Sequence, residues 1–253
     1  MADVEMRMAP AVGPDALRRR RTVIDLTRET YEGMPIWPGH QRPYMMVNLT
    51  HDDPKQSYGT GVSFETHSWL ISEHTGTHAD ATLEYSPDGV PIDQTPLEYY
   101  YGEATCIDVS HVRYPDYVTV DDLRAAVAAG GQEIRKGDIL IIETGQGDRT
   151  WPNQEFAEVF TGLDREAAIW IAEQGVVNIG TDSVSVDHSD DLAFSAHMVC
   201  AEYRIVITEI LTNLRPLIGK RFEFYGLPLK FRQGTGAPVR AIAILDGADE
   251  GSS

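Results

Sequence analysis

Short apolar runs, rich in valine, isoleucine and aromatic residues and flanked by glycine or proline, recur along the chain. Runs of this length and composition are typical of β-strands. The pattern therefore predicts strands at Thr22–Thr27, Tyr44–Thr50, Ser63–Ile71, Ala104–Val109, Asp138–Glu143, Val176–Gly180, Arg204–Ile210, Phe222–Leu227 and Val239–Leu245.

Two segments carry the signals that begin and end helices. Thr119 precedes a predicted helix at Val120–Ala129, which stops at two glycines, and Asp122 completes a weak capping box. A second predicted helix, Leu163–Gln174, has acidic residues in its first turn and stops at Gly175. An apolar strand follows each helix, which predicts α/β layers in the second half of the chain. The first half indicates antiparallel strands and long loops.

The composition is that of an ordinary globular protein. The chain has 253 residues, of which 42% are hydrophobic and 24% charged, and it contains no repeat or long linker. These features predict one mixed α/β domain at residues 22–253. Thirty-nine acidic against 21 basic residues give a net charge of −18, which opposes a nucleic-acid partner. No segment approaches the roughly 20 apolar residues of a membrane-spanning helix, so no membrane partner is expected.

The N-terminal segment does not resemble an export signal. Four consecutive arginines, Arg18 to Arg21, are followed by neither a long apolar region nor a small-residue cleavage site. We therefore expect residues 1–21 to form a disordered leader and the protein to be cytoplasmic. Cys106 and Cys200 lie in apolar segments, which predicts buried, reduced thiols in that compartment.

One stretch concentrates residues that bind metal ions. His74 and His78 are four residues apart around a glycine, and a turn there could bring the two rings together. If the chain is extended from His78 onward, then Asp80, Thr82 and Glu84 point to the same side as His78. Two imidazoles with one or two carboxylates make a nitrogen–oxygen site suited to zinc, manganese or cobalt. The alternative is a polar turn without a metal.

The pattern His-x-Gly-Thr-His-x-Asp, from His74 to Asp80, resembles the signature of the cyclase family of metal-dependent hydrolases. This family includes bacterial kynurenine formamidase and isatin hydrolase. The resemblance covers most of the chain and includes the segments Gly33–Gly39, Ile92–Glu98, Ile107–Val109, Asp138–Gly145 and Gly180–Asp187. It implies the fold of that family, a single mixed-sheet α/β domain of the swivelling β/β/α type.

The resemblance also implies further ligands. His197 and Glu209 match the distal histidine and glutamate of the family, which complete the metal site. Without the family, Glu209 could equally be a solvent-facing position on a half-exposed strand. With it, the expected ligand set is His74, His78, Asp80, His197 and Glu209, holding one or two divalent ions per subunit, zinc or manganese. Asp80 and Glu209 could bridge two ions. A small-molecule substrate and a homodimer or homotetramer are implied in the same way.

The sequence departs from the family directly after the signature. The family continues with x-Pro-x-His, whereas this chain has Thr82 and Glu84 at those two positions. The missing histidine is the proton shuttle of the family. Glu84 could replace it as a general acid or base, could bind the metal, or could mark a loss of the parent activity. His188 and His67 are other possible shuttles, although nothing in the spacing places either near the metal.

The predicted function is hydrolysis of an amide, lactam or ester bond by a metal-activated water, with Glu84 moving the protons. Trp37, Phe64 and Trp69 are expected to line the substrate pocket. One alternative is a non-hydrolytic cyclase or dehydratase that acts on a biosynthetic intermediate. Another is a catalytically inactive metal-binding protein that keeps the fold.

Overall fold

The computed structural model describes residues 21–53 and 61–246. The expected leader falls outside these residues except for Arg21, which begins the first strand, one residue before the predicted one. Within the described ranges no helix combines the length and the apolar character needed to cross a membrane.

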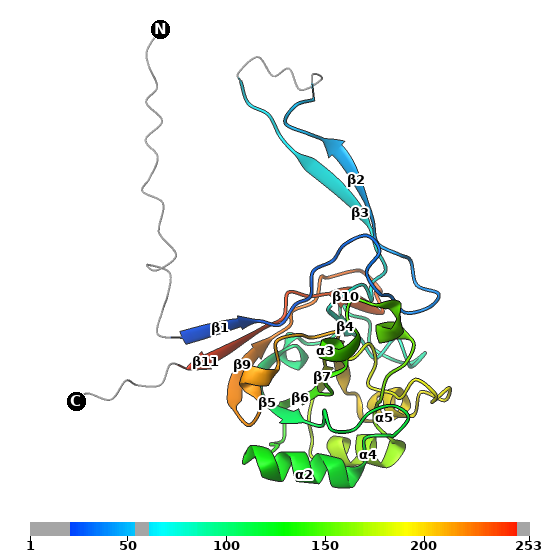
Figure 1. The fold of residues 1–253 in the computed structure, drawn as a ribbon, viewed down its shortest axis with the longest axis vertical. Coiled ribbons are helices and arrows are strands. Elements are labelled where there is room, and N and C mark those ends of the chain that lie inside the picture. The colour runs from blue at the N-terminus through cyan, green and yellow to red at the C-terminus, as the bar shows by residue number, and fades with distance from the viewer. Residues whose placement is uncertain (1–20, 54–60, 247–253) are drawn as a thin grey trace, which may run out of the picture.

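A nine-stranded mixed sheet forms the centre of the molecule, in the order β1-β11-β9-β5-β6-β7-β8-β4-β10 (Figure 1). Strands β5 to β8 run parallel to one another, and the strands on either side of them pair antiparallel. The predicted single mixed-sheet α/β domain is therefore confirmed. The strands are β1 (Arg21–Asp25), β4 (His78–Asp80), β5 (Tyr101–Asp108), β6 (Ile139–Glu143), β7 (Asn178–Thr181), β8 (Val206–Glu209), β9 (Arg221–Tyr225), β10 (Gly236–Pro238) and β11 (Ile242–Asp246).

The parallel strands are buried on both faces. Along β6, Leu140 and Ile142 belong to the cluster under the helices, whereas Ile139 and Ile141 belong to the cluster on the opposite face. A strand covered on both sides needs apolar residues at every position. This requirement explains why β6 could be predicted as a continuous apolar run.

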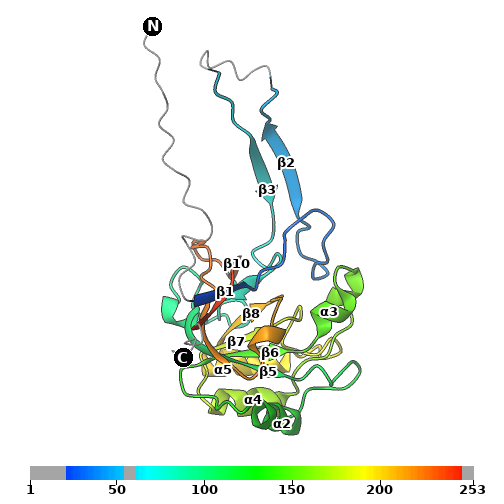
Figure 2. The same ribbon diagram turned by 60° about the vertical axis from the view of Figure 1, so that its left-hand side comes forward.

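Helices cover one face of the sheet, where α2 and α4 lie side by side below the strands (Figure 2). The helical segments are α2 (Val120–Gly130), α3 (Gln146–Thr150), α4 (Arg165–Glu173), α5 (Ser195–Tyr203) and the 3₁₀ turns η1 (Leu97–Tyr99), η2 (Gln154–Ala157) and η3 (Arg215–Leu217). The capping box of α2 is confirmed, because the Thr119 hydroxyl accepts from the Asp122 amide and the Asp122 carboxylate accepts from the Thr119 amide. Helix α4 begins later than predicted, with Asp164 as its N-cap.

Three elements near the site were missing from the prediction. Strands β4 and β10 have three residues each, which is too short for a periodic signal. The N-cap residue of α5 is Phe194, which has a left-handed backbone with φ of 50° and makes no capping bond, while the first amides of the helix donate to Asp191 and Asp187. Helix α5 therefore carries none of the start signals by which α2 and α4 could be recognised.

Strands β2 (Tyr44–Leu49) and β3 (Thr66–Leu70) form a separate two-stranded ribbon. The ribbon projects away from the body of the molecule in both ribbon views (Figures 1 and 2). Its large apolar side chains are exposed, with Trp69 at 44% and the nearby Phe64 at 51%. The two-stranded form leaves the ribbon without a core of its own.

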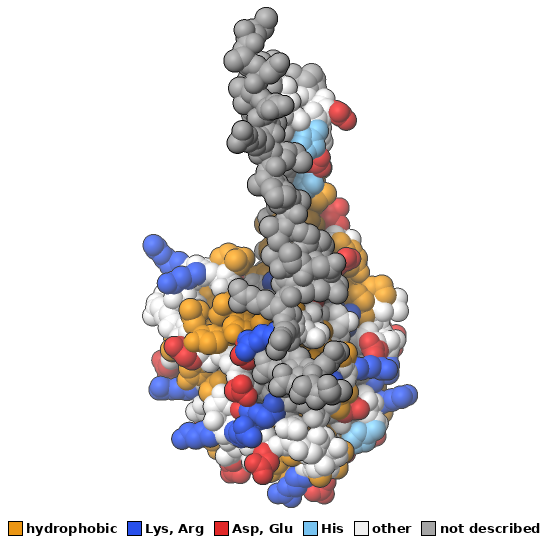
Figure 3. All heavy atoms as spheres, turned by 90° about the vertical axis from the view of Figure 1, so that its left-hand side faces the viewer, with side chains coloured by type: hydrophobic (Ala, Val, Ile, Leu, Met, Phe, Trp, Pro, Cys, Tyr) orange, Lys and Arg blue, Asp and Glu red, His pale blue; other side chains and the backbone are white. Residues whose placement is uncertain are grey.

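One face of the molecule shows how the charged side chains are distributed, and the interior contains both cysteines. On the face shown in Figure 3, basic and acidic side chains of the body are interspersed. Cys106 and Cys200 are both buried and free of disulfide bonds, as predicted.

Candidate metal centre

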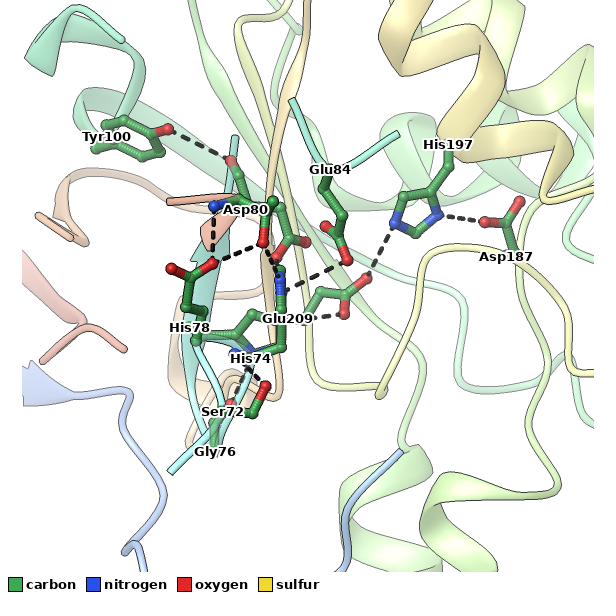
Figure 4. A network of polar contacts seen from close by, with 12 residues as sticks. Ser72, His74, Gly76, His78, Asp80, Glu84, Tyr100, Asp187, His197 and Glu209 are labelled. Carbon is green, nitrogen blue, oxygen red and sulfur yellow. Dashed lines mark hydrogen bonds and ion pairs between the residues drawn. The ribbon is translucent and has the colours of Figure 1, made fainter. Parts of the chain in front are cut away.

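The predicted ligands come together from three elements and one turn at one edge of the parallel strands (Figure 4). His78 and Asp80 lie on β4, Glu209 ends the neighbouring strand β8, and His197 lies on α5. His74 precedes β4 in a tight turn. Its Nδ1 atom lies 2.8 Å from Asp80 Oδ1, and His78 Nε2 lies 3.2 Å from the same oxygen. Glu209 is 3.6 Å from His78 Nε2 and 3.9 Å from His197 Nε2.

These side chains form two overlapping groups of possible metal ligands. One group is His74, His78 and Asp80, and the other is Asp80, His197 and Glu209, with the ligand atoms of each group within 4.8 Å of one another. Asp80 Oδ2 and Glu209 Oε1 are buried and have no hydrogen-bond partner among the described residues. Buried carboxylate oxygens without partners are costly unless a cation satisfies them. The donor set and the unpartnered oxygens fit a divalent metal ion, although each ligand assignment stays a prediction.

Each histidine is held from behind by an outer partner. His78 Nδ1 lies 2.8 Å from the Gly76 carbonyl, and His197 Nδ1 bonds to the Asp187 carboxylate. Both rings thereby turn Nε2 toward the centre of the site (Figure 4). Such outer hydrogen bonds fix the tautomer and orientation of metal-binding histidines.

The His74 ring is turned the other way, with Nδ1 toward the site and Nε2 toward an outer pair of residues, Thr235 and Glu73. Its Nε2 atom lies 3.0 Å from Thr235 Oγ1, and that hydroxyl donates to the Glu73 carboxylate at 2.7 Å. Because Thr235 uses its hydroxyl proton on Glu73, it accepts from His74 Nε2. The Nδ1 lone pair of His74 is left for the site.

Without a cation, the buried carboxylates Asp80 and Glu209 repel each other when both are ionised. Burial and the nearby charges of Asp80 and Glu84 raise the pKa of Glu209 well above its usual range. Asp80 is buried as well, but His78 and His74 hold its pKa below its usual range. Burial opposes protonation of His74, yet the hydrogen bond and charge of Asp80 raise the pKa of His74 to about 9. A bound cation would let both carboxylates ionise together.

Glu84 reaches the site through a turn, which corrects the prediction of an extended chain from His78 to Glu84. Strand β4 ends at Asp80, and the Glu84 amide donates to the Ala81 carbonyl at 3.0 Å. The Thr82 hydroxyl accepts from the Val90 amide, so this side chain holds the loop instead of facing the site. The turn places Glu84 Oε1 3.6 Å from His74 Nδ1.

A cavity of about 320 Å³ opens over the predicted ligands. Trp37 lines it and packs against Phe194 with ring centroids 6.1 Å apart, and its part in substrate binding stays a prediction. Phe64 and Trp69 do not line this cavity within the chain, because they lie beside and on the projecting strand β3, and their part in substrate binding stays a prediction. The apolar part of the wall consists of Pro35, Ile36, Trp37, Val184, Ala193, Phe194, Met198 and Ile210.

The two alternative shuttle histidines lie outside this cavity. His188 is stacked on Tyr117, with ring centroids 4.0 Å apart, and His67 lies on β3 near Glu65. Besides the predicted ligands His74, His78 and His197, one further histidine lines the cavity, His40, whose ring centroid is 5.4 Å from that of His74. His40 directly follows the family-like segment Gly33–Gly39, but no spacing in the sequence pointed from it to the site.

Backbone strain accompanies the end of β8. Ile210, directly after Glu209, has a φ of 60°, which is unusual for a β-branched residue. Its carbonyl accepts from the Thr77 hydroxyl at 2.7 Å, and its amide donates to the Ser183 carbonyl. These bonds hold Ile210 in the cavity wall and link it to the strand that carries His78.

Comparison with known proteins places the whole arrangement in context. Residues 24–188 match the family model described as "Putative cyclase". The chain is 29% identical over 226 residues to a kynurenine formamidase from Salinibacter ruber, covering 87% of this chain and 96% of the relative. A kynurenine formamidase from Erythrobacter litoralis is also 29% identical, over 89% of this chain and 94% of its own. The fold is similar to that of isatin hydrolase A from Labrenzia aggregata, with a TM-score of 0.77 at 22% identity over 90% and 94% of the two chains.

Proposed function

Since this chain belongs to the cyclase family, we propose that it is a metal-dependent hydrolase of an amide, lactam or ester bond, with C–N bonds as the main target. The observation that carries the proposal is the convergence of the two ligand groups, which share Asp80, beneath an apolar cavity. Relatives named kynurenine formamidase and isatin hydrolase support the same chemistry.

We propose one or two divalent ions, zinc or manganese, held by His74, His78, Asp80, His197 and Glu209. Such an ion would lower the pKa of a water molecule and polarise a substrate carbonyl when bound. The protein orients the site through Gly76, Asp187 and Thr235, which hold the outer nitrogens of the three histidines.

Glu84 is proposed to hold and move the proton in the reaction. Its side chain keeps 28% exposure while lining the cavity, so it is within reach of both a substrate and the ligand His74. Burial and the charge of Asp80 raise the pKa of Glu84 to about 8. A carboxyl with a pKa near the working pH can both accept and return a proton. The carboxyl would accept the proton of the attacking water and deliver it to the leaving nitrogen.

The cavity favours a neutral aromatic substrate. Among the described residues that line it, none is lysine or arginine, and the residues other than the predicted ligands that can hydrogen-bond through their side chains are His40, Trp37, Glu84, Tyr85 and Ser185. Apart from the proposed metal ion, a free carboxylate on the substrate would therefore meet the acidic Glu84 and no lysine or arginine among these lining residues. The aromatic rings of Trp37 and Phe194 suit a planar ring. We propose an aryl formamide or aryl lactam without a carboxylate.

The test is hydrolysis of matched pairs by the metal-loaded enzyme. Each pair contains a neutral formanilide, aryl lactam or aryl ester and its analogue with an added carboxylate. We expect turnover of the neutral amide members and uptake of oxygen-18 from labelled water into the product acid. A product without the label would favour the alternative of a non-hydrolytic cyclase or dehydratase. No turnover of any pair by fully metal-loaded protein would favour the catalytically inactive alternative.

We further propose a homodimer or homotetramer in the cytoplasm. An isolated two-stranded ribbon is rarely stable by itself, and exposed residues such as Trp69 and Tyr44 on β3 and β2 offer apolar surface to a second copy. The two buried free cysteines are compatible with a reducing compartment. Light scattering of the purified protein tests the assembly, since a monomeric mass would contradict it.

A further inference from the structure

A second cavity, of about 390 Å³, lies at the carboxyl ends of β6 and β7 and shares no lining residue with the cavity over the metal centre. Glu143 is the last residue of β6, and Asp182 directly follows β7. Asp148 on α3 and Arg215 on η3 lie on its wall, together with Arg28. The crevice outside the carboxyl ends of parallel strands is the usual place for ligands in open α/β sheets. A volume of this size can hold a small molecule.

Most of the charged groups around this second cavity are already satisfied within the protein. The Asp182 carboxylate accepts from the Thr144 amide and hydroxyl, both at 2.7 Å, and from the Gly147 amide at 3.1 Å. Asp148 forms an ion pair with Arg215 at 2.7 Å. These bonds leave Asp182 and Asp148 little capacity for a ligand.

The charge of Arg28 favours the ionised form of Asp182, and Arg28 forms no hydrogen bond or close ion pair with Glu143 among the described residues. Its guanidinium lies 4.7 Å from the centroid of the Trp151 ring, and it packs closely over Gly147. The backbone amide of Arg28 is not available to a ligand in the cavity, because it donates a hydrogen bond to the Thr77 hydroxyl. Arg28 is therefore fixed on the wall by stacking and by its backbone.

Two charged groups of this cavity are not satisfied in this way: Arg28, whose buried Nε has no hydrogen-bond partner among the described residues, and Glu143. Glu143 is 5% exposed, and in the described parts of the chain its carboxyl takes part in no hydrogen bond or close ion pair. Alternate residues of β6 face opposite sides of the sheet, so Glu143 shares the side of Ile139 and Ile141, away from α2 and α4. Its carboxyl therefore lies on the cavity wall, where a ligand or a proton can satisfy it.

We propose that this cavity binds a small organic cation, a primary ammonium or a guanidinium, whose N–H groups donate to the Glu143 carboxylate. Three carboxylates, Glu143, Asp148 and Asp182, face two guanidinium groups, Arg28 and Arg215, so one negative charge is left over when all are ionised. A cationic ligand would cancel that charge and form the hydrogen bonds that Glu143 lacks. The net charge of −18 also favours the approach of cations. This inference does not depend on the proposed hydrolase function.

The protonation of Glu143 agrees with this assignment. Burial, together with the charges of Asp182, Asp148 and Asp108, raises the pKa of Glu143 to about 8, with Arg215 opposing the shift. At neutral pH the free protein therefore keeps a proton on Glu143. A cation that binds the carboxylate must displace that proton, so binding should tighten as the pH rises.

The test is calorimetric titration of the full-length protein with butylamine, butylguanidine and, as the anionic control, butyrate. We expect saturable binding of butylguanidine or butylamine and none of butyrate. Glu143→Gln keeps the shape of the side chain but cannot carry the charge, so it should weaken cation binding by about tenfold or more. The exposed Glu158 offers a matched control, and Glu158→Gln should bind like the wild type.

A second measurement uses the wild-type protein alone, so it stands even if Glu143→Gln does not fold. The affinity for the bound cation should rise between about pH 6 and about pH 9, with release of a proton that two buffers of different ionisation enthalpy reveal. Equal cation affinity in wild type and Glu143→Gln, or no saturable binding of either cation, would overturn the proposal. Binding of butyrate in place of the cations would do the same.

Discussion

His78 and Glu209 are direct partners across the antiparallel strands β4 and β8, and their Nε2 and Oε2 atoms lie 3.6 Å apart. This pairing joins the histidine signature near the start of the domain to a carboxylate near its end. A metal site at this position therefore depends on the register of two short strands. It also depends on His197, which helix α5 adds from a third direction.

The central ligands should be indispensable for metal binding. We expect His78→Ala and Asp80→Ala each to abolish stoichiometric metal, because Asp80 belongs to both ligand groups and His78 contacts Asp80 and Glu209. Elemental analysis of the purified variants measures the content. His188→Ala is the matched control, since His188 is equally buried but stacks on Tyr117 outside the cavity. Full metal content in both ligand variants would mean that the cluster is merely polar.

Removal of the metal should lower the thermal stability. The ion would tie β4, α5 and β8 together in the folded state only, so a chelator removes a stabilising ligand. For free metal at about one hundred times its Kd the loss is about 2.7 kcal/mol. In a domain of this size that corresponds to a Tm lower by about 5–10 °C. Differential scanning calorimetry with and without chelator measures it, and His78→Ala should not respond. An unchanged wild-type Tm after verified metal removal would contradict a metal site that joins these three elements.

Glu84→Gln should separate a proton carrier from a metal ligand. The amide keeps the size of the side chain but cannot accept a proton, so kcat should fall by about 10²–10⁴-fold while metal content stays unchanged. If Glu84 is a ligand, the metal content should fall with the rate. Glu84→His should restore part of the activity, since it brings back the residue expected from the family. Wild-type kcat with full metal in Glu84→Gln would remove Glu84 from the mechanism, and His40 would be tested next.

Thr235 should tune metal affinity without touching the metal. The Thr235 hydroxyl accepts a hydrogen bond from His74 Nε2 and donates one to the Glu73 carboxylate. Thr235→Val therefore leaves the outer nitrogen of His74 without a partner. Loss of an outer partner of this kind weakens metal affinity by about 10–100-fold. Competition with a coloured chelator measures the Kd, and Thr235→Ser should keep the wild-type value. An unchanged Kd in Thr235→Val would show that Glu73 and Thr235 only hold the loop.

Glu143 should make the protein less stable as the pH rises. Its pKa is about 8 in the folded protein against 4.5 for an ordinary glutamate, because of burial and the charges of Asp182, Asp148 and Asp108. Between these two values the folded state binds more protons than the unfolded state, so the free energy of unfolding falls with increasing pH. Urea denaturation across this range should show a smaller fall for Glu143→Gln than for the wild type and for Glu158→Gln. Equal slopes would place Glu143 outside the pH dependence.

The sequence by itself determined the local features of this protein. The apolar run of β6 and the capping box at Thr119 each depend on a few consecutive residues, and both were predicted correctly. The pattern from His74 to Asp80 identified the family, because its spacing is fixed by one turn and one short strand. Resemblance extended the expected ligand set to His197 and Glu209, and the structure brings both beside Asp80.

Only the tertiary structure decided which of the remaining side chains meet. The alternation from His78 to Glu84 fails because β4 ends at Asp80, where pairing with β8 and β10 stops and a turn takes over. Trp69 looks like any other buried aromatic in the sequence, yet the ribbon carries it away from the cavity that Trp37 lines. Strand ends, loop paths and the register between distant strands arise from packing among residues far apart in the chain. Local spacing contains no information about those contacts.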